Sequence, residues 1–435
     1  MKTILFGFIL TPFFIWGANW PQWRGPNSSG HAPKGINYPS VWSAEKNILW
    51  KTNLPGRGHS SPVHDGKNIW VTTALETPAS EEEKKERLKQ NNGLPTVTVL
   101  SKVSLRALKI DPATGKILKD IEIFEKKQPQ WVHKLNSYAS PSPFLEKGKL
   151  YLHFGAYGNA CIDSESGQII WKNQEKDLWV MHENGPGSSP IIWKDFMIFH
   201  LDGSDSQSIV ALNKNNGKIA WQTKRSGEMR ENPQLQKSYS TPIVKEFNGR
   251  SVLISCAADW VYGYNPENGK ELWKVNYGIL GFSNVARPVL GNGMIYLSTC
   301  FMKAEIHAYK YDGQKTPKLA WKMTKGAPKM PSPILVGKQL YVVNDGGILS
   351  CVNAITGELA WRERLDGEFS ASPTYANGLI YFSDRTGKTT VIKPGQQLNI
   401  VSENILDGNP HMASLAPIQN SFLIRTDNKL YRVGK

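Results

Sequence analysis

Short apolar runs separated by turn residues extend along nearly the whole chain. One arrangement returns eight times: small residues and a proline, an apolar run, a glycine turn, an aromatic-rich run and a second turn. The entry prolines are Pro62, Pro143, Pro190, Pro242, Pro288, Pro333, Pro373 and Pro417. A unit of about 45 residues with turns about every 8–12 residues predicts four short strands per unit.

The ends of four units carry a second regular pattern, in which a glycine precedes a tryptophan by four residues. The pairs are Gly167 and Trp171, Gly217 and Trp221, Gly269 and Trp273, and Gly357 and Trp361. In the first unit Gly115 is followed by Lys119 at the tryptophan position. We expect these indole rings to pack between neighbouring units. Trp20 and Trp23 lie outside the repeat, and we expect them to contribute less to stability.

Four strands every 45 residues or so are typical of a β-propeller blade, which buries both faces of its sheet only by stacking in a ring. The chain begins with an unpaired strand around Trp50 (residues 47–53) and ends with two strands at 421–425 and 429–433. The sequence therefore predicts an all-β fold: an eight-bladed propeller of four-stranded antiparallel blades. The N-terminal strand would complete the last blade and remove an open edge.

The first unit contains an insertion at residues 75–97. Its central part, residues 80–90, is rich in Glu and Lys, which are strong helix formers, with Glu–Lys pairs four residues apart. This composition favours a short exposed helix, and a charged loop without regular structure is the alternative.

A more detailed repeat is readable at 211–221 and 351–361: Ala or Cys comes first, followed by Asp/Asn, then Thr/Asn-Gly, and finally Trp. This repeat resembles the pyrroloquinoline-quinone (PQQ)-like propeller repeat. The resemblance covers about 20–433. The N-terminal run 19–26 and the run 56–62 are similar to exported bacterial members of this group. Two branches share the fold: quinoprotein dehydrogenases, which hold PQQ and calcium, and the outer-membrane β-barrel assembly lipoprotein, a non-catalytic scaffold for partner proteins. Fold alone does not choose between them.

The first residues change the expected location. Residues 1–18 combine Lys2 with a short apolar stretch, which predicts a signal peptide, so that 19–435 would form a single exported propeller domain, periplasmic or secreted. No other stretch is apolar enough to span a membrane. The net charge is +15 over 435 residues, with the lysines spread along the chain and no nucleic-acid-reading motif. We expect a monomer that does not bind nucleic acid.

The cysteines bear on the quinoprotein alternative. Cys161, Cys256, Cys300 and Cys351 lie singly within apolar runs, and we expect buried free thiols. The resemblance to quinoprotein dehydrogenases would imply an adjacent pair of cysteines above the cofactor, and this chain has none. PQQ with calcium therefore stays an alternative, and no cofactor is predicted.

Polar residues gather at one topological position, just before the proline that opens each unit. In a propeller these connections surround one mouth of the central channel. The candidates for ligand binding are Arg57, His59, His133, Asn136, Tyr138, His182, Glu183, Asn184, Arg225, Arg287, Lys329 and His411. Three interpretations stay open: an ordinary wet rim, a pocket for an anionic or polyhydroxylated ligand, and a metal site made from His59, His133, His182 and Glu183.

These observations favour an exported, non-catalytic binding or scaffolding protein of the bacterial cell envelope. Its partner would be an envelope protein, an anionic polysaccharide or a small-molecule ligand. The alternatives are a PQQ-dependent oxidoreductase and an enzyme of unassigned reaction that uses the histidine-rich mouth. No nucleophile motif stands out in the sequence.

Overall fold

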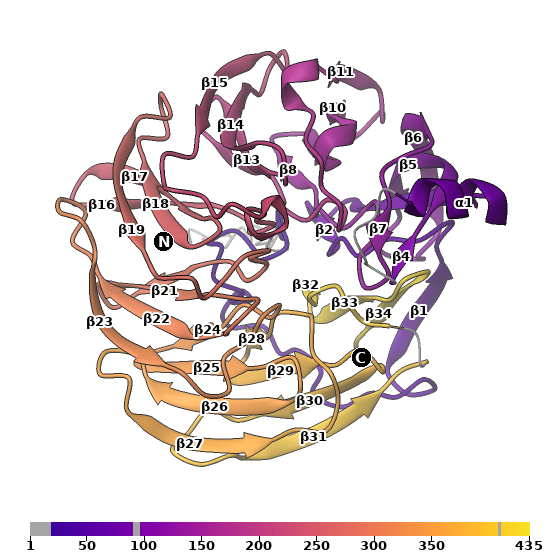
Figure 1. Ribbon diagram of the computed structural model, residues 1–435. Coiled ribbons are helices and arrows are strands. Elements are labelled where there is room, and N and C mark those ends of the chain that lie inside the picture. The colour runs from indigo at the N-terminus through magenta and orange to yellow at the C-terminus, as the bar shows by residue number, and fades with distance from the viewer. Residues whose placement is uncertain (1–18, 90–95, 408–409) are drawn as a thin grey trace, which may run out of the picture.

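The computed structural model describes residues 19–89, 96–407 and 410–435. The predicted signal peptide, residues 1–18, lies outside the described residues. Eight four-stranded antiparallel sheets are arranged around a central axis, as Figure 1 shows. The predicted eight-bladed propeller is therefore confirmed.

The first four blades follow one another along the chain, each running from its innermost to its outermost strand. Blade one consists of β2 (Val63–His64), β3 (Ile69–Pro78), β5 (Leu100–Ile110) and β6 (Ile117–Lys127). Blade two consists of β8 (Phe144–Glu146), β9 (Lys149–His153), β10 (Asn159–Asp163) and β11 (Ile169–Asn173). Blade three consists of β12 (Ile191–Trp193), β13 (Phe196–Asp202), β14 (Gln207–Asn213) and β15 (Ile219–Lys224). Blade four consists of β16 (Ile243–Phe247), β17 (Arg250–Cys256), β18 (Trp260–Tyr264) and β19 (Glu271–Asn276).

The remaining blades have the same order, and the last one takes its outermost strand from the N-terminus. Blade five consists of β20 (Val289–Gly291), β21 (Met294–Ser298), β22 (Ile306–Lys310) and β23 (Lys318–Met323). Blade six consists of β24 (Ile334–Val336), β25 (Gln339–Val343), β26 (Ile348–Asn353) and β27 (Leu359–Arg364). Blade seven consists of β28 (Thr374–Ala376), β29 (Leu379–Ser383), β30 (Lys388–Ile392) and β31 (Ile400–Ile405). Blade eight consists of β32 (Ala416–Ile418), β33 (Ser421–Arg425), β34 (Lys429–Val433) and β1 (Ile48–Asn53).

Ring closure joins the two ends of the chain. Strand β1 pairs antiparallel with β34, with Trp50 opposite Arg432 and Asn53 opposite Lys429. The predicted closure is thus confirmed, and it covers a strand edge that would otherwise be free to pair with another chain.

The repeated tryptophans pack between blades as predicted. Trp171 of blade two donates its Nε1–H to the carbonyl of Lys214 in blade three at 2.9 Å. A Cβ built on Gly217, whose φ is +74°, would lie 2.4 Å from the Trp171 ring, so only glycine leaves room for the indole. Trp361 of blade six reaches the carbonyl of Gly395 in blade seven in the same way, at 3.0 Å. In blade one the alkyl chain of Lys119 takes the place of the indole, 2.8 Å from a Cβ on Gly167.

The insertion in blade one contains the predicted helix, α1 (Glu81–Leu88). Ser80 caps its N-terminus by accepting a hydrogen bond from the Glu83 amide at 3.1 Å. Glu83 pairs with Arg87 four residues later at 3.3 Å, and Arg87 also donates to the carbonyl of Leu100 at 2.7 Å. A two-stranded sheet of β4 (Val97–Thr98) and β7 (Val132–His133) follows beside it. Short 3₁₀ turns lie at η1 (Gly155–Tyr157), η2 (Lys176–Leu178) and η3 (Pro233–Leu235).

Residues 20–24 lie across the central axis, and the chain then follows blades seven and eight until it reaches β1 (indigo in Figure 1). Trp20 exchanges backbone hydrogen bonds with His64 of blade one, whereas His31 pairs with Tyr375 of blade seven. Trp20 is 0% exposed and belongs to the core between blades eight and one. The prediction that replacing Trp20 costs less stability than replacing a repeat tryptophan stays a prediction, but the burial of Trp20 inside the ring argues against it.

All four cysteines are buried free thiols, as predicted. In the described ranges, no helix has both the length and the apolar character needed to cross a bilayer.

Candidate functional site

A ring of hydroxyl groups surrounds the central axis at the start of the innermost strands. The amide of Ser61 donates to Oγ of Ser142 in the next blade at 2.8 Å, and the pattern continues from blade to blade at 2.9–3.0 Å. The hydroxyl groups that accept these backbone amides belong to Ser61, Ser142, Ser189, Thr241, Ser332, Ser372 and Ser414. These bonds explain why a small hydroxyl residue precedes the entry proline: its hydroxyl oxygen accepts a hydrogen bond from a buried backbone amide of the neighbouring blade.

The ring of hydroxyl groups corrects the predicted start of blade eight. In blade eight the hydroxyl comes from Ser414, so Leu415 stands where the other blades have proline. Pro417 instead lies within β32, opposite Phe422. The assignment of Pro417 as the entry proline is therefore wrong, because strand register, and not the nearest proline, sets the frame. In blade five the hydroxyl position holds Arg287, which leaves the ring without a hydroxyl there.

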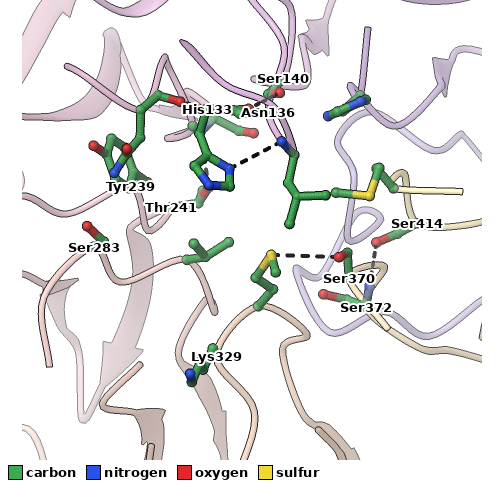
Figure 2. A pocket seen from close by; sticks show the side chains of 18 of the residues that line it. His133, Asn136, Ser140, Tyr239, Thr241, Ser283, Lys329, Ser370, Ser372 and Ser414 are labelled. Atoms are coloured by element: carbon green, nitrogen blue, oxygen red, sulfur yellow. Dashed lines mark hydrogen bonds between the residues drawn. The ribbon is translucent and has the colours of Figure 1, made fainter. Parts of the chain in front are cut away.

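A cavity of about 550 Å³ opens at the axis above this ring. Figure 2 shows that His133 and Asn136 face Lys329 across the space, with Ser370, Ser372 and Ser414 on a third side. Its apolar lining consists of Trp23, Leu135, Phe282, Val285, Phe301, Met330 and Met412, and its charged or titratable lining of His59, His133, Tyr239, Lys329, Asp345 and Arg385. Both the size and the mainly apolar surface are those of small-ligand pockets.

The N-terminal segment forms the floor of the cavity. Trp23 lines it from below, and the guanidinium groups of Arg24 and Arg287 lie 5.8 and 6.0 Å from the centre of its ring. Arg24 donates to the carbonyls of Pro373 (2.6 Å) and Pro333 (3.2 Å), in blades seven and six. Arg287 donates to the carbonyl of Pro242 at 2.9 Å and to Oε1 of Gln22 at 2.8 Å. Two buried arginines thus hold the segment in place through carbonyl groups.

Five of the twelve predicted site residues line the cavity. They are His59, His133, Asn136, Asn184 and Lys329. Asn136 donates its side-chain amide to the carbonyls of Asn184 (2.7 Å) and Pro186 (3.1 Å), which joins the connections that open blades two and three.

The other seven predicted residues do not line the cavity. Arg57 pairs with Asp427 at 3.3 Å, and Glu183 accepts from Lys237 at 2.9 Å. Tyr138 is fully buried, Arg287 lies in the floor, and His411 is 1% exposed behind the wall.

Two of these seven are held in buried contacts between loops and blades. Arg225 makes a bidentate pair with Asp202 at 3.0 and 2.8 Å. Nε2 of His182 accepts a hydrogen bond from the Ala156 amide at 2.8 Å. His182 therefore has a structural contact and does not join His59 and His133 at the axis.

The electrostatics of the cavity wall centre on Lys329 and Asp345. Asp345 accepts the Lys329 backbone amide at 2.6 Å through Oδ2, and burial raises the pKa of its carboxyl, so its charge is disfavoured. The Lys329 ammonium lies 5.0 Å from the centre of the Phe301 ring. Arg385 is occupied by Glu368 at 2.8 Å and Ser370 at 2.7 Å.

The two histidines of the wall differ in their partners. Nε2 of His59 lies 2.9 Å from Asp427. Burial lowers the pKa of both His59 and His133; Asp427 opposes this at His59, whereas Lys134 adds to it at His133. Both rings are therefore mainly neutral at pH 7.

The lining does not match the needs of a calcium-bound quinone. Calcium takes 6–8 oxygen ligands, several of them carboxylates. Among the described residues that line the cavity, Asp345 is the only one with a carboxylate, and its Oδ2 is already used by the Lys329 amide. In the part of the chain that the structure describes, no three His, Cys, Asp or Glu side chains are grouped so as to hold a metal ion.

Eight four-stranded blades, recurrent inter-blade tryptophans and a cavity at the axis define a PQQ-like β-propeller protein. The family model described as outer membrane protein assembly factor BamB matches residues 107–299 and 257–402, which is more than half of the chain. The chain belongs to this family.

Curated relatives are distant. An uncharacterised protein of Rickettsia prowazekii, RP232, is 23% identical over 329 residues, covering 69% of this chain and 71% of that protein. Outer membrane protein assembly factor BamB of Shewanella oneidensis is 21% identical over 240 residues, covering 52% of this chain and 57% of that protein.

Solved structures show the same fold. BamB from Moraxella catarrhalis matches with a TM-score of 0.53 and 13% identity, covering 79% of this chain and 95% of that one. A europium-containing methanol dehydrogenase matches with a TM-score of 0.67 and 10% identity, covering 96% and 98%. At such identities the likeness shows the fold alone, so it does not distinguish a binding protein from an oxidoreductase.

Proposed function

We propose that the protein is an exported, non-catalytic binding or scaffolding protein of the bacterial cell envelope, whose axial cavity receives a ligand or a segment of a partner. The observation that carries the proposal is the cavity itself: about 550 Å³, largely apolar, and lined by polar groups most of which already have internal partners. The hydroxyls of the ring accept backbone amides, and His59 contacts Asp427. Such a wall is suited to hold a molecule rather than to transform it.

The only Ser–His–Asp arrangement that we find in the described part of the chain supports this proposal. Oγ of Ser255 lies 2.7 Å from Nε2 of His200, whose Nδ1 is 3.9 Å from Asp202. All three residues are buried and none lines the cavity. A nucleophile must reach its substrate, so this group stabilises the contact between blades three and four instead.

Family membership supports the scaffolding role. The family's description and the Shewanella relative both name an outer membrane protein assembly factor, BamB, and such a name favours a role in contacts with partner proteins for this chain. The net charge of +15 would favour anionic partners, such as an acidic envelope protein or an anionic polysaccharide.

Site-specific photocrosslinking in cells tests the proposal. A photoreactive benzoylphenylalanine replaces Leu135, which is 37% exposed at the cavity, or Leu118, which is 47% exposed on the outer strand β6. We expect a discrete adduct from position 135 and none from position 118. Equal adducts at both positions, or none at 135, would contradict a role for the mouth. Export is checked separately, by release of the protein with the periplasmic or secreted fraction.

Reconstitution tests the oxidoreductase alternative. Purified protein is mixed with PQQ and calcium, and reduction of an artificial electron acceptor is followed with simple alcohols and sugars. We expect no reduction above that of the free cofactor. Turnover that disappears in a variant with a filled cavity, Val285→Trp, would replace the present proposal with a quinoprotein activity.

A further inference from the structure

Apolar side chains dominate the upper wall of the axial cavity on the side of blades four to six. Phe282 and Phe301 stand with their ring centres 6.2 Å apart, and a hydrogen bond from the Lys303 amide to the Leu280 carbonyl, 2.9 Å, joins the two loops that carry them. Met330 and Met412 add two thioether side chains to the lining. Thioether side chains adapt to the shape of what they contact, which suits a wall that takes a flexible or variable molecule.

The apolar surface continues outward past the cavity. Ile279 and Met302 lie on the same two loops as Phe282 and Phe301, and their exposed fractions are 77% and 64%. Large exposed apolar residues beside a pocket mark an entry for an apolar molecule. The floor is closed by Trp23, so this lip borders the way in.

One positive charge in this wall has no counter-ion. Among the described residues no ion pair includes Lys329; its ammonium lies over the Phe301 ring at 5.0 Å. Asp345 is within electrostatic reach, but burial raises the pKa of that carboxyl, and its Oδ2 is hydrogen-bonded to the Lys329 amide. An unpaired ammonium beside an apolar surface is a complement to an anion.

We propose that the cavity binds an amphiphilic anion: a molecule with an apolar, aryl or alkyl body and a single carboxylate or sulfonate group. The body lies between Phe282, Phe301, Met330 and Met412, and the anion lies at Lys329. A volume of about 550 Å³ is in the range of about 300–1,000 Å³ typical of drug-sized ligands. This inference rests on the proposed function and names the ligand class for its cavity.

A pair of fluorescent probes separates the two parts of the recognition. Anilinonaphthalene sulfonate has an aryl body and an anion, whereas phenylnaphthylamine has a similar body and no charge. Each is titrated into the purified full chain, and its fluorescence is followed. We expect both to bind saturably at one site. Lys329→Met should weaken the sulfonate by about tenfold or more and change the affinity of the neutral probe less than about twofold.

Matched variants show where the probes bind. Lys325→Met removes the same charge from the same connection between β23 and β24, at an exposed position outside the cavity wall, and should leave both affinities unchanged. Val285→Trp fills the cavity and should abolish binding of both probes. Leu135→Trp obstructs the cavity from a different lining position, so that the test does not depend on the correct folding of Val285→Trp alone. Far-ultraviolet circular dichroism confirms that each variant is folded.

Three results would overturn the inference. They are equal weakening of both probes by Lys329→Met, equal effects of Lys329→Met and Lys325→Met, and sulfonate binding that survives both filling variants. None of these would affect the proposed function, which depends on a crosslinked partner at the mouth and not on these probes. Loss of that crosslink with normal probe binding would in turn reject the scaffolding role alone.

Discussion

Trp361 provides a quantitative test of the packing between blades. Its side chain is 8% exposed, lies in the core shared by blades six and seven, and donates to the Gly395 carbonyl at 3.0 Å. A buried tryptophan removes about 150–250 Å² from water, which corresponds to about 4–6 kcal/mol at about 25 cal/mol per Å². The alanine of Trp361→Ala retains part of this burial. We therefore expect a loss of about 3–5 kcal/mol in the free energy of unfolding.

Urea denaturation combined with hydrogen–deuterium exchange measures this loss and locates it. Exchange should rise in peptides from β27 and from blade seven, with blade three unaffected, because the indole packs in the core shared by its own blade and the next. Trp361→Phe keeps most of the apolar area and loses the hydrogen bond, so it should cost less than Trp361→Ala. The control is Trp179→Ala, because the Trp179 side chain is 48% exposed. We expect this variant to lose at most half as much unfolding free energy as Trp361→Ala. Equal losses at positions 361 and 179, or a uniform rise in exchange, would refute the inter-blade role.

Three other predictions follow from the same packing and charges. Gly217→Ala should destabilise the protein more than Gly249→Ala in urea denaturation: both glycines have positive φ, but a Cβ at 217 would lie 2.4 Å from Trp171, whereas one at 249 meets nothing within 4 Å. Arg24→Met should lower the free energy of unfolding by about 2–5 kcal/mol, since it leaves the Pro373 and Pro333 carbonyls buried without donors. The control is Arg364→Met at an exposed site, and a thermal midpoint of Arg24→Met no lower than that of the control would contradict this. Burial lowers the pKa of the His182 imidazole to about 3. As pH falls below about 6.5, the imidazole therefore takes up a proton in the unfolded chain but not in the folded one. The stability that the protein has above this pH is then lost progressively towards pH 3. His182→Gln should flatten the dependence of unfolding free energy on pH by about 1.4 kcal/mol per unit between pH 6 and 4, and a dependence as steep as that of the wild type would refute the assignment.

The sequence by itself determined the architecture. The spacing of Gly217 and Trp221, repeated in four blades, is a local pattern that sets strand, turn and indole in each of them. The number of blades and the closure by the strand around Trp50 followed from counting these units, because a blade cannot bury its faces alone. Helix α1 was likewise predicted from its own residues, since Glu–Lys pairs act within one or two turns.

Only the tertiary structure decided what occupies the axis. Trp23 and Arg24 have no repeat around them, and their place under the cavity depends on carbonyls of blades six and seven, more than 300 residues away in sequence. His133 faces the cavity and His182 does not, although both precede an entry proline. Side-chain direction in such irregular connections is set by contacts with other blades. Periodicity therefore predicts the ring, whereas the lining of its centre depends on long-range packing that no local pattern records.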